Sequence, residues 1–380
     1  MTAAPARHLR PTWYEIDLGA VAHNVRELRR LVGPGVAIYA CLKRNAYGCG
    51  APAVAPVCMQ AGADGLAVGN IDDALAIRAA GVAGPLLLYP SCLPEVAATV
   101  EALDLVPTVS TVEEAAAWNA AFSRRRKVFL KVDVGLLRAG SMVGQLPDLL
   151  HALGRLDRLE PAGLYGHFFS YGAAVTAGQY EWQFARMAAA MRAAADAGVA
   201  LPIVMVSSTS AVLDHPEMDL TGVDPGRLLY GLSASAHPAR HGTFRQALVG
   251  FKTRLVMRKT LGALDPGDFA LPFAPRPGMR IGILPLGWGD GLPRPLPEGA
   301  AALVRGRRVA LVGPVHLEHT RIDLTDAPDA TPGDEVVLIG RQGDAEITLA
   351  EAVALWGIDE TTFHGQMRDH IPRRYVDLAG

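Results

Sequence analysis

The feature that most constrains the fold is a regular alternation of short apolar runs with alanine-rich segments over the first 245 residues. Segments such as WQFARMAAAMRAAADAG have the length and apolar spacing of helices. The apolar runs are continuous rather than alternating, which is typical of parallel strands buried on both faces. The runs are VAIYACL (36–42), GLAVG (65–69), PLLLYP (85–90), LDLVPTV (103–109), KVFLKVDVG (127–135), PAGLYGHFF (161–169), PIVMVSS (202–208) and GRLLYGL (226–232). Eight strands alternating with helices predict an α/β fold, a (β/α)8 barrel.

After about residue 245 the pattern changes to short strand-like runs such as MRIGILPLGW and DEVVLIG. Turn sequences with glycine and proline, such as DPGD and TPGD, separate them. This combination predicts a compact β domain. The sequence therefore predicts a barrel over residues 12–244 and a C-terminal β domain over residues 245–380, with residues 1–11 packing on the β domain.

Charge and composition argue against several other classes of protein. The chain has 36 basic and 38 acidic residues and a net charge of −2, without the basic excess of a nucleic-acid-binding protein. It shows no apolar run long enough to span a membrane, and its first residues lack the apolar core of a secretion signal. Its four cysteines lack metal-ligand spacing and are interpreted as reduced thiols of a cytoplasmic protein.

Polar residues gather where the predicted barrel strands end or begin. In such barrels the reactive groups collect at the carboxyl ends of the strands. The residues at these positions are Lys43, Lys131, Asp133, Arg138, His167, Thr209, Ser210, Asp224, Gly226 and Arg227. Hydroxyls and a glycine after the seventh and eighth runs suit a phosphate, and Lys43 across from them suits the aldehyde of pyridoxal 5'-phosphate, with which a lysine forms a Schiff base.

Several motifs resemble the alanine racemase family, whose members are pyridoxal-phosphate enzymes of fold type III. CLKRNAYGCG resembles the family's cofactor-lysine motif, a lysine followed four residues later by Tyr-Gly-X-Gly. LKVDVGLLRAG resembles its Lys-X-Asp-X-Gly-X-X-Arg-X-Gly segment. PLGWGDGLPR resembles its Gly-Tyr-Ala-Asp-Gly segment, with Trp288 for the tyrosine, and GDEVVLIG and HIPRRY fit its C-terminal end. These motifs occur in the family's order over nearly the whole chain.

The resemblance implies a homodimer with shared active sites, each completed by the partner's β domain. It implies that Lys43 binds the cofactor and acts as one catalytic base, and that Tyr47 and Thr209 contact the phosphate together with the backbone near Gly226. It further implies that His167 stacks on the pyridine ring and that Arg138 orients the cofactor and the substrate carboxylate. Lys131 corresponds to a position that can be carbamylated; paired with Asp133, it is also consistent with a plain ion pair.

One departure concerns the ring nitrogen of the cofactor. The family places an arginine two residues before the glycine of the eighth strand, where this chain has Asp224. A carboxylate stabilises a protonated pyridine, which withdraws electrons more strongly than a neutral one. A shift of strand register would instead place Arg227 there.

Two further departures lie in the β domain. The family's second base is a tyrosine, and ungapped counting puts Phe269 in its place, which cannot transfer a proton. The family's Met-Asp segment here contains His316, Glu318 and His319. On a strand His316 and Glu318 point the same way and suit a shared divalent metal ion. Alternatively, His316 or His319 replaces the missing base.

These observations predict a pyridoxal-phosphate-dependent racemase, an isomerase acting at the α-carbon of a small amino acid. The departures favour an alternative, a one-base enzyme acting on β-hydroxy amino acids as an aldolase, hydroxymethyl transferase or dehydratase, with or without a metal ion. A non-catalytic carrier of the cofactor is a third hypothesis, against which Lys131, Arg138 and His167 argue, since a carrier needs no clamp for a substrate carboxylate.

Overall fold

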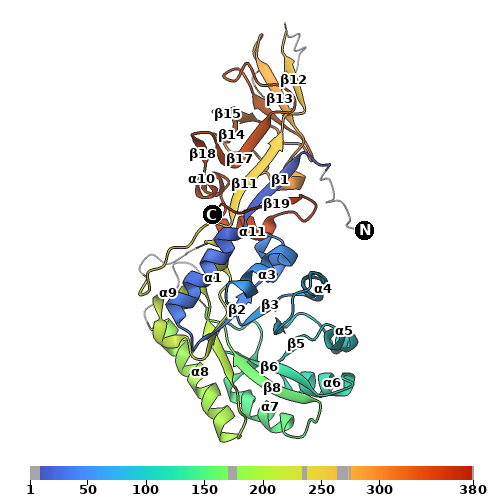
Figure 1. Cartoon of the computed structure of the whole chain (residues 1–380), viewed down its shortest axis with the longest axis vertical. Helices are drawn as coiled ribbons and strands as arrows, with labels where there is room; N and C mark the ends of the chain where they lie inside the picture. Colours follow the sequence, from blue (N-terminus) through green and yellow to red (C-terminus); the bar gives the residue numbers. More distant parts are fainter. Residues whose placement is uncertain (1–8, 170–177, 233–237, 263–272, 274, 379–380) are drawn as a thin grey trace. The chain divides into compact units, whose positions relative to one another are not determined.

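The structure, a computed structural model, describes residues 9–169, 178–232, 238–262, 273 and 275–378 (Figure 1). The chain divides into two compact units. The barrel unit comprises residues 20–46 and 50–245, and the β unit comprises residues 1–19, 47–49 and 246–380. None of the helices in the described ranges combines the length and the apolar character that crossing a membrane requires.

The strands of the barrel unit run parallel and close on themselves. Within the described residues the order is β5-β4-β3-β2-β10-β9-β8-β6, and a β5–β6 pairing completes the ring. The strands are β2 (Ala37–Cys41), β3 (Gly65–Val68), β4 (Leu86–Leu88), β5 (Val106–Val109), β6 (Arg126–Asp133), β8 (Leu159–Tyr165), β9 (Ile203–Ser207) and β10 (Gly222–Val223), with the short β7 (Ser141–Met142) added beside β6. The predicted (β/α)8 barrel followed by a separate β domain is confirmed.

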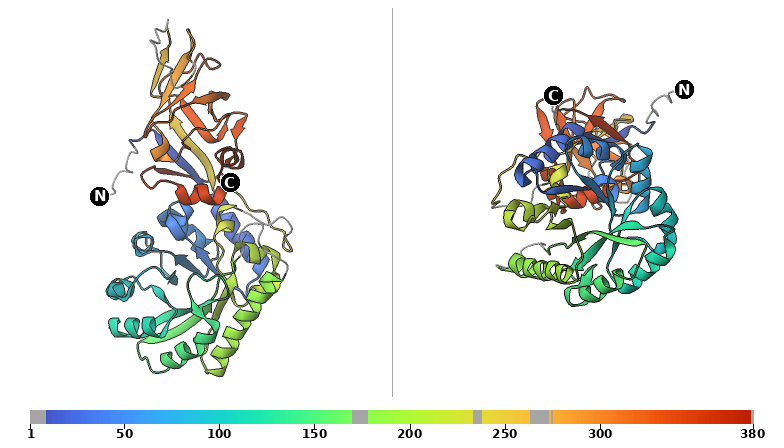
Figure 2. Two further views of the ribbon diagram at one scale, coloured as in Figure 1. Left: turned by 180° about the vertical axis from the view of Figure 1, so that it is seen from behind. Right: turned by 60° about the horizontal axis from the view of Figure 1, so that its bottom comes forward.

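Helices alternate with these strands and surround them in the right-hand view of Figure 2. Asn70 and Thr111 cap α4 and α6 by accepting a hydrogen bond from a backbone N–H of the first turn. Such caps satisfy donors that the helix itself leaves unpaired. The helices are α1 (Leu18–Val32), α3 (Ala51–Gln60), α4 (Ile71–Ala79), α5 (Ala97–Ala102), α6 (Val112–Ala121), α7 (Leu146–Leu153), α8 (Gln179–Asp196) and α9 (Thr209–Asp214).

Large side chains fill the interior of the barrel. Tyr39, Phe129, Tyr165 and Met205 belong to one buried cluster, in which the Phe129 ring lies 5.6 Å from that of Tyr39 and 6.3 Å from that of Tyr165. The barrel is therefore a packed core rather than a channel. A cavity for a ligand lies beyond this cluster, where the strands end.

The eighth strand differs from the prediction. It was expected over residues 226–232, but β10 is Gly222–Val223, and Arg227–Tyr230 forms the 3-10 helix η5. Pro225 separates them, since proline has no N–H to donate to a neighbouring strand and restricts the residue before it. Asp224 consequently follows the strand and lies at its carboxyl end.

The β unit is built around an extended sheet in the order β12-β13-β16-β15-β14-β17-β11-β1-β19, with β18 beside β17. Two short helices, α10 (Leu349–Leu355) and α11 (Glu360–Gln366), lie between β18 and β19 in the chain. The strands are β1 (Thr12–Asp17), β11 (Leu248–Arg254), β12 (Met257–Thr260), β13 (Arg280–Leu284), β14 (Ala301–Val304), β15 (Arg307–Val312), β16 (Thr320–Asp323), β17 (Glu335–Gln342), β18 (Ala345–Ile347) and β19 (Arg373–Val376).

The barrel does not begin at residue 12, as the sequence suggested. Strand β1 pairs antiparallel with β11 and parallel with β19, so Thr12–Asp17 is a central strand of the β unit. Its two hydrogen-bonding edges are both occupied by strands from the C-terminal part of the chain, which local sequence cannot indicate. Just before it, the Arg10 guanidinium forms an ion pair with the buried Asp290 of the same unit.

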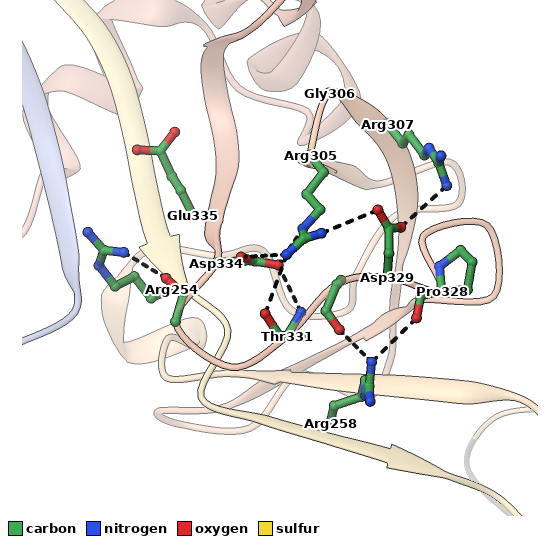
Figure 3. Close-up of polar contacts among 12 residues, drawn as sticks. Arg254, Arg258, Arg305, Gly306, Arg307, Pro328, Asp329, Thr331, Asp334 and Glu335 are labelled. Carbon is green, nitrogen blue, oxygen red and sulfur yellow. Dashed lines mark hydrogen bonds and ion pairs between the residues drawn. The ribbon is translucent and has the colours of Figure 1, made fainter.

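Exposed ion pairs hold the edge of the β unit together (Figure 3). Arg305, at the tip of the β14–β15 hairpin, donates to Asp334 at 2.7 Å and to Asp329 at 3.3 Å. Arg258 donates to the carbonyl of Ala330 at 2.8 Å. Exposed pairs of this kind contribute little each to stability, so we interpret them as fixing the loop before β17.

Candidate active site

A cavity of about 260 Å³ lies at the carboxyl ends of the barrel strands. Five residues singled out from the sequence line it: Lys43, His167 and Asp224 follow β2, β8 and β10, Lys131 lies within β6, and Arg138 follows β6. The lining residues are Lys43, Gly69, Tyr89, Pro90, Ser91, Lys131, Arg138, Ala139, His167 and Asp224. Sequence reasoning missed Tyr89, although its place directly after the apolar run of β4 was a signal for it.

Lys43 opens a short segment of unusual backbone, α2 (Lys43–Tyr47). The four residues after Lys43 all have φ between 53° and 55°, the left-handed region. This conformation costs about 1–2 kcal/mol per residue for side chains other than glycine. The Asn45 side chain compensates by accepting a hydrogen bond from Ala51 N at 2.7 Å, and Asn45 N donates to Asp73 at 3.0 Å. Strain held in this way is typical of functional sites.

The Lys43 side chain runs past Gly69 toward Tyr89. A Cβ atom on Gly69 would lie 3.3 Å from Lys43 Cγ, so the glycine leaves room for the lysine stem. Lys43 Nζ lies 5.1 Å from the centre of the Tyr89 ring, within the range of a cation–π contact. The amine is thereby directed into the cavity.

Asp224 and Tyr89 form a pair on the wall of the cavity. The Tyr89 hydroxyl donates to Asp224 Oδ2 at 2.8 Å. Asp224 is 6 % exposed, and its other oxygen, Oδ1, is buried without a hydrogen-bond partner among the described residues. Burial raises the pKa of Asp224, while the Tyr89 hydrogen bond and the charges of Lys43 and Lys131 oppose that rise. Burial and the Asp224 charge raise the pKa of Tyr89, which keeps its proton.

Lys131 is a buried amine beside an aromatic ring. It is 5 % exposed, and its Nζ lies 4.0 Å from the centre of the Tyr165 ring. Burial, opposed by the charges of Asp224 and Asp133 and reinforced by those of Arg138 and Lys43, lowers the pKa of Lys131 to about 8. A fraction of this amine is therefore neutral near physiological pH.

Asp133 shapes the loop that carries Arg138. Its carboxylate accepts hydrogen bonds from the backbone N–H groups of Gly135 at 2.7 Å, Leu137 at 3.1 Å and Arg138 at 2.9 Å. The loop turns tightly, with φ of 131° at Gly135 and 54° at Leu137. Asp133 thus holds the backbone of Arg138, whose exposed side chain lies at the cavity mouth.

His167 follows β8 and faces several cations. Burial lowers the pKa of His167 to about 3, and Lys43, Lys131 and Arg138 add to the effect. The imidazole is therefore neutral at pH 7. A neutral ring can pack against another aromatic system without adding positive charge to a site that already holds three cations.

Thr209, Ser210 and Arg227 form a second polar group of the barrel unit. Arg227 donates to Ser210 Oγ at 3.0 Å, and Leu228 N donates to Thr209 Oγ1 at 3.4 Å. Both hydroxyls belong to the first turn of α9, and Gly226 directly precedes η5. The structure therefore brings together the hydroxyls and the glycine that the sequence suggested for a phosphate, and it adds the guanidinium of Arg227 beside them. None of them lines the cavity itself.

Tyr47 is not among the residues that line the cavity. It belongs to the β unit, where its carbonyl is 3.0 Å from Nδ1 of the buried His364. Its predicted contact with a phosphate stays a prediction. Phe269, the residue expected in place of the family tyrosine, lies outside the described residues.

His316, Glu318 and His319 lie on a bend between β15 and β16, not on a strand as expected. Gly313 and Pro314 end the strand before them, and His316 N donates to the carbonyl of His319 at 2.9 Å. All three side chains are exposed. In the part of the chain that the structure describes, no three His, Cys, Asp or Glu residues are grouped as metal ligands. The metal-binding interpretation of His316 and Glu318 has no support in this arrangement.

A closed parallel barrel with a lysine-lined cavity at its strand ends, joined to a β unit, defines a class of cofactor-dependent barrel proteins. The family of alanine racemase N-terminal domains matches residues 16–234, and the family of alanine racemase C-terminal domains matches residues 249–375. The chain belongs to the alanine racemase family.

Individual relatives align with this chain along almost their whole length. The alanine racemase of Halothermothrix orenii is 30% identical over 377 residues, covering 98% of this chain and 99% of the relative. That of Symbiobacterium thermophilum is 34% identical over 351 residues, covering 91% and 92%. Among solved structures, the alanine racemase from Bacillus anthracis with bound L-Ala-P has a TM-score of 0.88 at 27% identity, covering 99% of this chain and 97% of that one.

Proposed function

We propose that the chain is a pyridoxal-phosphate-dependent amino-acid racemase acting at the α-carbon of a small amino acid. Membership of the alanine racemase family supports this proposal. The observation that carries it is the placement of Lys43 in the cavity with Arg138, His167 and Asp224. Two amines, one carboxylate, one imidazole and one guanidinium line this cavity, and they include the groups that such a cofactor and an amino-acid substrate require.

The described residues fit the cofactor. Lys43 lines the cavity and can join the aldehyde, and Asp224 Oδ1 is a buried acceptor without a donor among the residues that the structure describes. Thr209 and Ser210 supply hydroxyls, and Arg227 supplies positive charge for a phosphate. When bound, pyridoxal phosphate withdraws electrons from the α-carbon of the amino acid joined to it.

Each residue then has a separate task. With pyridoxal phosphate bound, Lys43 would hold its aldehyde and would move the proton at the α-carbon of the substrate. Arg138 at the mouth holds the substrate carboxylate, which suits a guanidinium because of its planar pair of donors. Asp133 keeps the Arg138 backbone in place through its bonds to the loop.

Racemisation requires a second group that transfers a proton on the opposite face of the α-carbon. We propose that the chain works as a homodimer with shared active sites and that this group comes from the β unit of a second copy. The exposed imidazoles of His316 and His319 are the candidates named from the sequence. A cytoplasmic location likewise stays a prediction.

The first test is the covalent attachment of the cofactor. Borohydride reduction of the chain loaded with pyridoxal phosphate should fix the cofactor on Lys43, detectable by peptide mass spectrometry. The Lys43→Ala variant should carry no such adduct and should lose at least 10³-fold in activity, of the order expected when a catalytic acid–base group is removed. Lys127→Ala, which changes an exposed lysine on β6, is the control and should behave as the wild type. An adduct on another lysine would contradict the assignment.

Asp224 favours one alternative, a one-base reaction such as aldol cleavage or dehydration of a β-hydroxy amino acid. A carboxylate beside the pyridine nitrogen stabilises negative charge at the α-carbon and so widens the range of reactions. Incubation of each enantiomer of alanine in deuterated water separates the two functions. A racemase incorporates deuterium with inversion, whereas a one-base enzyme exchanges the proton with retention and releases aldehyde or ammonia from serine or threonine.

A further inference from the structure

We infer that Asp224, positioned by Tyr89, accepts a hydrogen bond from the protonated ring nitrogen of the cofactor, so that this chain holds pyridoxal phosphate as a pyridinium. The inference rests on the proposed function and deepens it. It assigns a role to Tyr89, and it gives the site an electronic character opposite to that of an arginine at the same place.

The geometry of the carboxylate is the first support. Tyr89 occupies Asp224 Oδ2 at 2.8 Å, which fixes the orientation of the group. Oδ1 remains buried without a donor among the described residues. A buried acceptor of this kind is costly unless a ligand supplies the missing hydrogen. Since Asp224 lines the cavity, the donor is expected from the molecule that fills it.

The charges around the cavity are the second support. Lys43, Lys131 and Arg138 line it as cations, and Asp224 is the carboxylate in the same lining. Asp133 does not compete for a ligand there, because its oxygens are taken up by three backbone N–H groups. The groups that face Asp224 are Tyr89, Lys43 and Lys131, with Tyr165 and Cys41 nearby, and the two lysines favour its ionised form.

The position in the chain is the third support. Asp224 stands two residues before Gly226, where the resemblance to the family leads one to expect an arginine facing the ring nitrogen. An arginine keeps its own proton and leaves the ring nitrogen unprotonated. Arg227 does not restore that arrangement, because its guanidinium donates to Ser210 Oγ at 3.0 Å and it does not line the cavity.

The chemical consequence concerns electron withdrawal. A protonated ring draws the electron pair released at the α-carbon further into the cofactor than a neutral ring does. The site should therefore lower the barrier to removal of the α-proton and prolong the life of the deprotonated substrate. Substrates with a leaving group on the β-carbon should then lose it more often than in a site with an arginine.

The test is a nuclear magnetic resonance measurement on the full chain loaded with pyridoxal phosphate labelled with ¹⁵N in the ring. We expect the wild type to show the chemical shift of a protonated pyridine nitrogen at pH 7. Asp224→Asn, which keeps the shape and removes the charge, should show the shift of an unprotonated nitrogen. Tyr89→Phe should fall between the two, because the carboxylate remains but loses its orientation. Lys127→Ala, which changes an exposed lysine on β6 outside the cavity, is the control and should match the wild type.

An unprotonated nitrogen in the wild type, or a protonated one in Asp224→Asn, would overturn the inference. A Tyr89→Phe shift equal to that of the wild type would overturn the positioning role of Tyr89. If Asp224→Asn fails to fold or to hold the cofactor, the ¹⁵N chemical shift of the wild type still tests whether the ring nitrogen is protonated. Failure of the proposed function is recognised separately, since Lys43 would then carry no cofactor after reduction.

Discussion

At the scale of single residues, burial shifts the pKa of three groups that line the cavity: it lowers the pKa of Lys131 and His167 and raises that of Asp224. Lys131 illustrates this best, because desolvation lowers the pKa of its amine to about 8 although Asp224 and Asp133 act in the opposite direction. The same depression prepares the amine for carbamylation, the predicted modification, since only a neutral amine attacks carbon dioxide. Motif spacing identified Lys131, but its environment became visible only with the Tyr165 ring beneath it.

The lowered pKa of Lys131 predicts a pH dependence of stability. Below about pH 8 the folded chain must keep a buried charge, whereas the unfolded chain keeps its lysine protonated up to its ordinary value of 10.5. The unfolded state therefore binds more protons between these values, and stability rises with pH over that window. Lys131→Met removes this contribution. Its unfolding free energy minus that of the wild type should fall by up to about 3 kcal/mol between pH 7 and pH 10.5.

Urea unfolding of the chain without cofactor, in buffer free of carbon dioxide, measures this difference. Lys127→Met is the matched control, because Lys127 lies on the same strand with an exposed side chain. The difference in unfolding free energy between Lys127→Met and the wild type should not change with pH. If the difference in unfolding free energy between Lys131→Met and the wild type is also independent of pH, the buried amine does not cause the pH dependence of stability.

His167 provides a second residue-scale prediction. With the pKa of His167 near 3, its imidazole should stay neutral down to about pH 4. Two-dimensional ¹⁵N–¹H spectra that report the imidazole nitrogens measure this directly, and loss of the signal in His167→Asn assigns it. A His167 signal that titrates near the ordinary value of 6.5 would contradict the described environment.

At the scale of elements, the left-handed segment after Lys43 is the part that places the amine. Apolar spacing cannot predict such a segment, because the left-handed conformation is unfavourable for residues other than glycine and residues 44–47 contain none. It persists because Asn45 bonds to Ala51 N, and because Asp73 accepts from Asn45 N. These partners come from α3 and α4, so the segment depends on the packing of its neighbours.

Asn45→Ala should therefore destabilise the chain by about 1–3 kcal/mol, the cost of leaving a partly buried backbone donor without a partner. It should also weaken cofactor binding, because Lys43 is no longer held in place. Thermal unfolding with and without cofactor measures both effects. Gln60→Ala, at the exposed end of α3, is the control and should change neither quantity. If Asn45→Ala binds the cofactor as tightly as the wild type, the left-handed segment is not needed to place Lys43 for cofactor binding.

At the scale of the whole molecule, a shared active site makes activity depend on concentration. If each cavity is completed by a second copy, a monomer has Lys43 and Arg138 but lacks the group on the opposite face. Dilution should then reduce the activity per chain in parallel with the fraction of dimer. Sedimentation velocity and racemisation rates over the same concentration range test this. Activity per chain that stays constant while the dimer dissociates would contradict a shared site.

Periodicity and motif spacing by themselves predicted the barrel, the β domain and a lysine at the strand ends of the barrel, and the structure confirms the two folds and places Lys43 in the cavity. Few other folds are compatible with continuous apolar runs separated by helical segments. In a parallel barrel, the carboxyl ends of all strands lie at the same face. Only the tertiary structure decided that Thr12–Asp17 joins the β unit, that the eighth strand ends before Asp224, and that Tyr89 binds Asp224. The physical reason is that strand partners and contacts across a barrel mouth arise from chain closure, which brings together residues that share no local pattern.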